Sequence, residues 1–334
     1  MSANPPPNTP PALPLGIDDF LQAAGWGEAD VEPLPGDASF RRYFRVRRAG
    51  ESAMLMDAPP PNEDPRPFIH VGKWLAQHGL RAPHIYAEQP DRGLVLIEDF
   101  GPHHLRDWIE ANPEEERAIY AGAIEALVEL HRSPPGPFAP YDLETYLREA
   151  SLLPDWYCVA AGLEVDGMGL EAAWREVLEP LLERQRPGVT VLRDYHAENI
   201  MMLPGGEQGL IDFQDALVGH PAYDLVSLLQ DARRDVSPAL EAEMLALYAD
   251  RMAPGEEFAA DYARLGAQRN AKIVGIFARL WKRDGKPRYL PMIPRVWQAM
   301  ERDLAHPALA PVADWFDANI PARLRESGGG DLAV

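Results

Sequence analysis

In the first third of the chain, short apolar runs separated by Gly and Pro follow the pattern of β-strands. Strands are predicted over residues 39–48, 52–58, 83–89 and 93–100, and a turn at Gly50 joins the first two into a hairpin. One helix is predicted within this region, over residues 67–79, where Gly79 ends a segment that carries Ile69, Trp74 and Leu75.

After Gly101 the apolar residues recur with the spacing of amphipathic helices. Helices are predicted over residues 114–131, 143–153, 170–184, 238–251, 256–282 and 294–304. Two short apolar runs between them, residues 188–192 and 208–213, are predicted as strands. The pattern therefore predicts an α+β fold with two lobes, a small antiparallel β-rich lobe followed by a larger, mainly helical one.

The predicted lobes are residues 15–101 and 102–327, and a ligand site is expected where they join. Residues 1–14 are Pro-rich and are predicted to be a disordered tail, and residues 328–334 a frayed end. The first residues lack the basic and apolar regions of a secretory signal, and no apolar run approaches the roughly 18 residues of a membrane span. A cytoplasmic protein is expected.

The composition disfavours or excludes several kinds of binding partner and site. The formal net charge is -20 and the pI is near 4.8, which disfavours binding to nucleic acid or to an anionic membrane. The only cysteine, Cys158, excludes an internal disulfide and a Cys-based zinc site. A small-molecule ligand is therefore favoured, and no obligate protein partner is indicated.

The segment "VLRDYHAENIMML", residues 191–203, places a polar hexad between two apolar runs. Asp194 and Asn199 bound the hexad, and Asp212 follows the next apolar run. If residues 200–203 pair with residues 209–211, these three side chains gather at one rim. Such a set suits phosphoryl transfer, with one carboxylate facing an acceptor hydroxyl and two oxygen ligands holding Mg²⁺. The alternative is that these residues are ordinary turn formers.

Other residues near this segment are candidates for supporting roles. Asp224 lies where a helix begins after Pro221 and can anchor the loop by hydrogen bonds. Arg193, next to Asp194, is a candidate for holding the loop or the charge. His196 lies inside the hexad and could hydrogen-bond the substrate or the γ-phosphate, but a lone histidine is more often structural, so it is left out of the catalytic set.

The segments "VLRDYHAENIMM" and "GLIDFQDALVGHPAYDLVSLL" resemble the catalytic region of the aminoglycoside phosphotransferase and choline kinase family, within the protein-kinase-like fold. The resemblance extends in outline over residues 17–325. It implies an ATP-dependent kinase with Mg²⁺, in which Asp194 is the catalytic base and Asn199 and Asp212 are the metal ligands.

The same resemblance implies a nucleotide site. "LIEDFG" would be the hinge whose backbone binds adenine, at Glu98, Asp99 and Phe100. The turn over residues 35–46 would cover the phosphates, and its candidate residues are Asp37, Ala38, Ser39, Arg41 and Arg42.

The chain departs from the family where a phosphate-binding lysine is expected. The strand there reads "SAMLMDAPP" and contains no lysine. Either a nearby cation substitutes, with Arg41, Arg42 and Arg45 as candidates, or ATP is held differently. Alternation places Arg42 on the opposite face from the other two. The missing lysine also leaves open an inactive, nucleotide-binding scaffold.

A basic segment in the C-terminal third favours an anionic or neutral acceptor over a polycation. Its cations are Arg269, Lys272, Arg279, Lys282, Arg283, Lys286, Arg288 and Arg295. Arg279, Lys282 and Asp215 are the acceptor-site candidates. A solvated helix face is the alternative for the basic residues.

This segment, with "GDASFRRYFRV" and "LMDAPP", resembles one branch of the family, the anomeric kinases for N-acetylmuramate and N-acetylglucosamine in bacterial cell-wall recycling. The resemblance implies that these amino sugars become 1-phosphates. Other acceptors stay open, namely an aminoglycoside, choline, homoserine or a protein hydroxyl. A metal hydrolase built on His196 and His220 is a further alternative.

Overall fold

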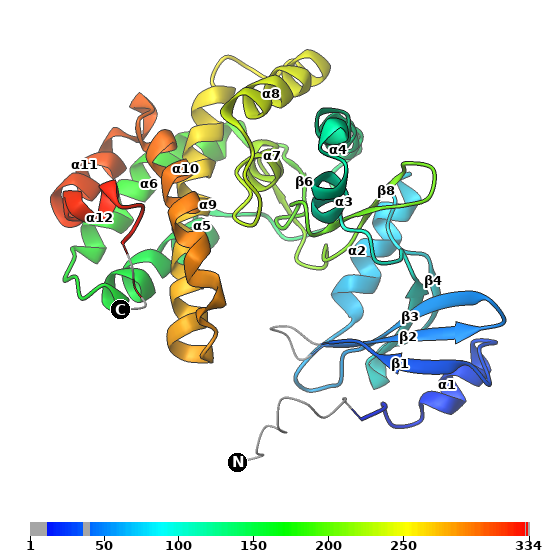
Figure 1. The fold of residues 1–334 in the computed structure, drawn as a ribbon. Helices are drawn as coiled ribbons and strands as arrows, with labels where there is room; N and C mark the ends of the chain where they lie inside the picture. The colour runs from blue at the N-terminus through cyan, green and yellow to red at the C-terminus, as the bar shows by residue number, and fades with distance from the viewer. Residues whose placement is uncertain (1–11, 36–40, 331, 333–334) are drawn as a thin grey trace. The chain divides into compact units, whose positions relative to one another are not determined.

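The computed structural model describes residues 12–35, 41–330 and 332, and its helices and strands divide between two compact units (Figure 1). The first unit contains residues up to His103 together with Met201–Asp215. The second contains His104–Ile200 and the chain from Ala216 onward. The first unit's main segment ends at residue 103, two residues from the predicted boundary at residue 101. That residues 201–215 also belong to the first unit was not predicted.

The first unit is built on a five-stranded antiparallel sheet with the strand order β1-β2-β3-β5-β4. Its strands are β1 (Asp30–Pro33), β2 (Arg42–Arg48), β3 (Glu51–Asp57), β4 (Ile85–Gln89) and β5 (Leu94–Glu98). Ala49 and Gly50 connect β2 to β3, and both have positive φ, 47° and 85°. A two-residue turn of this kind matches the twist of the paired strands, so the predicted hairpin is confirmed.

One face of this sheet is covered by helix α1 (Ile17–Ala23), whose Phe20 packs in one apolar cluster with Phe44 and Val46 of β2. The alternation of buried Phe44 and Val46 with more exposed neighbours is the period-two pattern of a half-buried strand. Helix α2 (Arg66–Gln77) and the two-stranded pair β7 (Ile200–Met202) and β8 (Gln208–Leu210) complete the unit. The predicted pairing of these two strands is confirmed.

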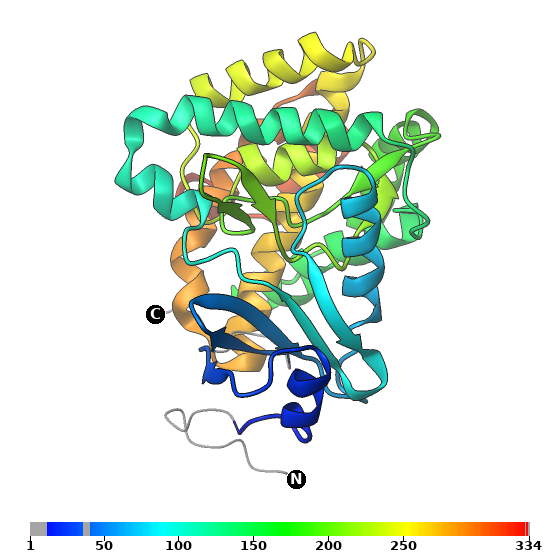
Figure 2. The same cartoon turned by 90° about the vertical axis from the view of Figure 1, so that its right-hand side faces the viewer.

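The second unit is mainly helical and is organised around α9 (Phe258–Asp284), a helix of 27 residues. Helices α10 (Ile293–Leu304), α7 (Ala222–Leu229) and α5 (Leu143–Ala150) pack against α9, and α10 lies beside it in Figure 1. The remaining helices are α3 (Leu105–Ala111), α4 (Glu116–Arg132), α6 (Gly167–Arg184), α8 (Pro238–Met252), α11 (Ala310–Asn319) and α12 (Ala322–Glu326). Figure 2 shows α4 and α8 side by side.

The helices predicted for the second unit are confirmed, with three differences. The helix predicted to run to residue 153 ends at Ala150, and a π-helical turn follows over Leu153–Cys158, where Pro154 lacks the N–H that an α-helix needs. Strand β6 (Val189–Val191) pairs with β9 (Leu217–Gly219), which was not predicted. Helices α3, α11 and α12, and α1 of the first unit, were also not predicted; each has ten residues or fewer, which leaves little periodicity to detect.

In two places of the second unit, distant segments of the chain lie in close contact. At Gly275 of α9, an added Cβ would lie 2.3 Å from the carbonyl carbon and oxygen of Leu152, so only glycine lets the two segments come this close. Gly328 and Gly329, the first residues of the segment whose composition suggests a frayed end, are buried. The Tyr157 hydroxyl donates a hydrogen bond of 2.6 Å to the carbonyl oxygen of Gly329.

Candidate active site

The hexad identified in the sequence forms the loop between β6 and β7. Asp224, fully buried on α7, accepts hydrogen bonds from the backbone amides of Leu192, at 2.6 Å, and Arg193, at 2.8 Å. Arg193 has a positive φ of 72°, a conformation that is uncommon outside glycine and is held here by these bonds. Burial raises the pKa of Asp224 to about 7, although the hydrogen bonds from the two amides work to lower it. The anchoring interaction predicted for Asp224 is thus present.

The Arg193 side chain belongs to a buried ionic cluster. Its guanidinium forms a short ion pair with Glu149 of α5. Glu149 also pairs with the Nζ of Lys272, at 3.0 Å, and accepts a hydrogen bond from Tyr141. The Lys272 ammonium donates to the Tyr223 hydroxyl at 3.2 Å. Charges desolvated in this way are retained only when they are paired, so the cluster ties the loop to α5, α7 and α9.

Asp194 lies in the loop beside this cluster. Among the residues that the structure describes, none donates a hydrogen bond to its carboxylate, which therefore keeps its lone pairs for another partner. Burial works to raise the pKa of Asp194, but the charges of Lys272 and Arg269 outweigh it and lower the pKa. Arg269 is itself buried and donates a hydrogen bond of 2.7 Å to Ser227. Asp194 is consequently an ionised carboxylate at neutral pH.

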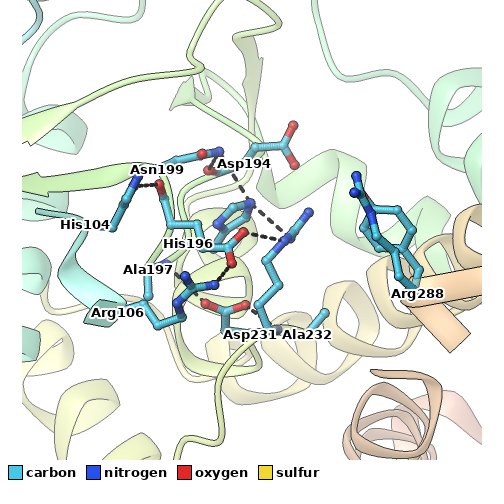
Figure 3. A network of polar contacts seen from close by, with 12 residues as sticks. His104, Arg106, Asp194, His196, Ala197, Asn199, Asp231, Ala232 and Arg288 are labelled. Carbon is cyan, nitrogen blue, oxygen red and sulfur yellow. Dashed lines mark hydrogen bonds and ion pairs between the residues drawn. The ribbon is translucent and has the colours of Figure 1, made fainter. Parts of the chain in front are cut away.

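Asn199 closes the loop (Figure 3). Its amide nitrogen donates a hydrogen bond of 2.9 Å to the backbone carbonyl oxygen of Asp194 and lies 3.3 Å from Nε2 of His196. The amide oxygen, a hard neutral ligand of the kind that Mg²⁺ accepts, lies on the other side of the side-chain amide from these two acceptors. The donor chemistry of Asn199 therefore fits a Mg²⁺ ligand.

Asp212 belongs to the first unit, two residues after β8. Its φ of 57° is again the left-handed region. Phe213, next to it, is buried and stacks on Phe68 of α2 with ring centroids 4.9 Å apart, which fixes the backbone at this position. Gln214 donates a hydrogen bond of 2.9 Å to one carboxylate oxygen of Asp212. A carboxylate held in this manner also suits a hard divalent cation.

The hinge candidates lie at the end of β5. Arg81 forms two hydrogen bonds with the Glu98 carboxylate and thereby lowers its pKa. Asp99 accepts hydrogen bonds of 2.7 and 3.2 Å from Arg45 and one of 2.9 Å from the Gly101 amide. Phe100 packs in an apolar cluster with residues of the β7–β8 region, namely Met201, Leu203 and Ile211. These contacts occupy the side chains of the hinge candidates, and the Glu98 amide donates a hydrogen bond of 2.8 Å to the carbonyl oxygen of His84.

Of the phosphate-loop candidates, Asp37, Ala38 and Ser39 lie outside the described residues. Arg42 pairs with Asp57 across the β2–β3 ladder, and Arg45 pairs with Asp99. Arg41 pairs with Glu63 at 3.3 Å. Burial works to lower the pKa of Arg41, but nearby charges that include Asp212 raise it, so this cation lies near Asp212.

The acceptor-site candidates belong to both units. Arg279 and the exposed Lys282 lie near the C-terminal end of α9, where the Lys282 ammonium covers the Trp281 ring at 3.7 Å. Asp215 ends the second segment of the first unit. The structure instead brings Lys272 and Arg269, from the middle of α9, to the Asp194 loop. Both belong to the basic segment noted in the sequence, but nothing in its pattern distinguishes them from their neighbours.

Two further observations concern all of the residues that the structure describes. Over the described ranges, no group of three or more His, Cys, Asp and Glu side chains is arranged to hold a metal, so the ligand cluster that a metal hydrolase would need is not found there. Within the same ranges, no helix has both the length and the apolar character to cross a bilayer.

Comparison with known proteins identifies the class. A profile of the phosphotransferase enzyme family matches residues 30–265. The chain therefore belongs to the phosphotransferase enzyme family, as its motifs imply. The N-acetylmuramate/N-acetylglucosamine kinase of Caulobacter vibrioides is 36% identical over 355 residues, 92% of this chain and 96% of that protein. The protein of the same name from Pseudomonas aeruginosa is also 36% identical, over 91% of this chain and 94% of its own length.

Solved structures confirm the two-lobed kinase-like fold. The choline kinase LicA from Streptococcus pneumoniae aligns with a TM-score of 0.61 at 14% identity, covering 88% of this chain and 97% of its own. The ADP-bound aminoglycoside phosphotransferase APH(2'')-Ib aligns with a TM-score of 0.59 at 14% identity, covering 87% and 100%. At such low identity the likeness concerns the fold and leaves the acceptor open.

Proposed function

We propose that this protein is an ATP-dependent kinase that phosphorylates the anomeric hydroxyl of N-acetylmuramate and N-acetylglucosamine, and so supplies sugar 1-phosphates in bacterial cell-wall recycling. The 36% identity to kinases named for these two sugars, over more than nine tenths of the chain, supports the acceptor. Because the reaction consumes ATP, we place it in the cytoplasm. The observation that carries the mechanism is the Asp194 carboxylate, which lies beside the charges of Lys272 and Arg269 and accepts no hydrogen bond from the described residues.

In this proposal Asp194 accepts a hydrogen bond from the anomeric hydroxyl and orients its oxygen toward the γ-phosphorus of ATP. The acceptor oxygen bonds to that phosphorus as the bond to the β,γ-bridging oxygen breaks, and the hydroxyl proton passes to Asp194. A carboxylate with a lowered pKa is a weak base, so the proton is transferred late. Arg193 does not contact the sugar; through Glu149 it holds the loop in its strained conformation.

We assign Asn199 and Asp212 as the Mg²⁺ ligands, from their oxygen donors and from the resemblance of their motif. When bound, Mg²⁺ neutralises charge on the β- and γ-phosphate oxygens. The backbone around Asp99 and Phe100 is proposed to bind adenine. Arg41 is the cation assigned to the phosphates in place of the missing lysine, because its weak pair with Glu63 and its position near Asp212 set it apart from Arg42 and Arg45.

Cations next to Asp194 also bear on the acceptor. Arg269 forms no ion pair with a carboxylate among the described residues, and its positive charge, like that of Lys272, lies beside the Asp194 carboxylate. A polycationic aminoglycoside would be repelled there, whereas a neutral sugar or one bearing a carboxylate would not. Arg279, Lys282 and Asp215 stay predictions as acceptor contacts.

A panel assay tests the proposal. The protein is incubated with ATP, Mg²⁺ and either N-acetylmuramate, N-acetylglucosamine, kanamycin, choline or homoserine, and ADP release is measured. We expect turnover with the two acetylated sugars alone. Turnover only with kanamycin or choline would refute the acceptor, and ATP binding without any turnover would favour the inactive scaffold.

A matched pair of variants tests the base. Asp194→Asn keeps the shape of the side chain and should lower kcat by about 10²- to 10⁴-fold. Asp250→Asn makes the same chemical change at an exposed position on α8 and should leave kcat unchanged. Full activity of Asp194→Asn would show that another residue accepts the proton.

A further inference from the structure

His196, for which the sequence favoured a structural role over a catalytic one, contacts the side chain of Asn199. The imidazole is 5% exposed. Its Nε2 lies 3.2 Å from Nη1 of Arg233 and 3.3 Å from Nδ2 of Asn199. A guanidinium has only N–H donors, so Nε2 of His196 must be the acceptor and the ring hydrogen must be on Nδ1.

This choice of tautomer decides which way the Asn199 amide faces. The amide nitrogen has two acceptors on its side, Nε2 of His196 and the backbone oxygen of Asp194 at 2.9 Å. A flipped amide would place its oxygen against both acceptors and lose two hydrogen bonds. The oxygen of Asn199 is therefore fixed on the side away from His196.

Arg233 is itself held, so the donor that sets the tautomer does not move freely. Its Nε forms an ion pair of 2.8 Å with Glu198, and its backbone amide donates a hydrogen bond of 2.8 Å to the Asp231 carboxylate. The second oxygen of Asp231 accepts from the Ala197 amide at 3.1 Å, and Arg106 of α3 binds Glu198 as well. Figure 3 shows these contacts as one network around His196.

We propose that His196 is a positioning residue whose Nε2 lone pair, enforced by Arg233, fixes the Asn199 amide with its oxygen presented to the metal. The inference rests on the proposed role of Asn199 as a Mg²⁺ ligand. Groups that orient a metal ligand in this way commonly change metal affinity by about 10- to 100-fold when they are removed. His196 needs no contact with ATP or the sugar.

The test measures Mn²⁺ binding to the full chain in the presence of a non-hydrolysable ATP analogue, with free Mn²⁺ read by electron paramagnetic resonance. His196→Phe keeps a planar ring but lacks the acceptor, and should raise the Kd for Mn²⁺ by about 10-fold or more. His196→Gln can place its amide oxygen near the Nε2 position, and its Kd should stay within about threefold of the wild-type value. His196→Asn, which reaches only to the Nδ1 position, should behave like His196→Phe and serves if the latter does not fold.

A double-mutant cycle with Asn199→Ala separates this inference from the proposed function. Asn199→Ala alone should raise the Kd, and adding His196→Phe should raise it no further. Two results would overturn the role of His196 and leave that of Asn199. One is a Kd for Mn²⁺ that is unchanged in both His196→Phe and His196→Asn when these variants are folded. The other is a Kd for Mn²⁺ that is raised as much in His196→Gln as in His196→Phe. An unchanged Kd in Asn199→Ala would refute the metal role itself, and with it this inference.

Discussion

Asp224→Ala is expected to destabilise the fold by removing the partner of two buried amides. The fully buried Asp224 carboxylate accepts hydrogen bonds from the amides of Leu192 and Arg193, at 2.6 and 2.8 Å. Each buried donor left without a partner costs about 1 to 3 kcal/mol, so Asp224→Ala should lower the free energy of unfolding by about 2 to 6 kcal/mol. Asp224→Asn keeps one acceptor oxygen and should lower it by about half as much.

Urea denaturation followed by circular dichroism measures both losses. Asp250→Ala, on the exposed face of α8, is the control and should change stability by no more than about 0.5 kcal/mol. Because Arg193 relies on these bonds for its positive φ, kcat should fall in both Asp224 variants even at temperatures where they remain folded. A stability of Asp224→Ala within about 0.5 kcal/mol of the wild type would refute the anchoring argument.

Three other predictions follow from single contacts. Gly275→Ala should lower stability by about 1 to 3 kcal/mol, read as a lower Tm, because its Cβ would meet the Leu152 backbone at 2.3 Å; an unchanged Tm would contradict this. Arg41→Gln should raise the KM for ATP by about tenfold or more. Arg42→Gln is the control and should not raise it, because Arg42 is already paired with Asp57. Equal effects of the two changes on this KM would refute the assignment of Arg41 to the phosphates. Burial lowers the pKa of His131 to about 3, whereas an unfolded histidine titrates near 6.5, so the unfolded chain binds more protons between these values. Stability should therefore be full above pH 6.5 and fall toward pH 3, by up to about 1.4 kcal/mol per pH unit, and His131→Phe should reduce this slope if the reasoning is right.

The elements that the sequence predicts well are those with a local cause. The β2–β3 hairpin follows from two apolar runs and a turn at Gly50, and α9 follows from apolar residues that recur over 27 positions. The loop that holds Asp194 and Asn199 was found because its polar hexad interrupts two apolar strands. In each case a few adjacent residues carry enough information to determine the local structure.

The contacts that complete the loop could not be predicted in this way. Glu149 and Arg193 are 44 residues apart in sequence, and their ion pair forms only when the fold brings α5 beside the loop after β6. Strand β9 has three residues and reads as a turn until β6 lies beside it. Lys272 was one cation among eight in the basic segment, and only its contacts with Glu149 of α5 and Tyr223 of α7 distinguish it.

The central claim is that phosphate is transferred to the anomeric oxygen of an N-acetylated amino sugar. Phosphorus NMR of the product formed from N-acetylmuramate, ATP and Mg²⁺ tests it directly. A phosphate on the anomeric carbon couples to a single sugar proton, so the account predicts a new phosphomonoester signal split into a doublet that is lost on mild acid treatment. A signal split by the two protons of a methylene carbon, as a phosphate on the primary hydroxyl would give, or an acid-stable product, would contradict the account.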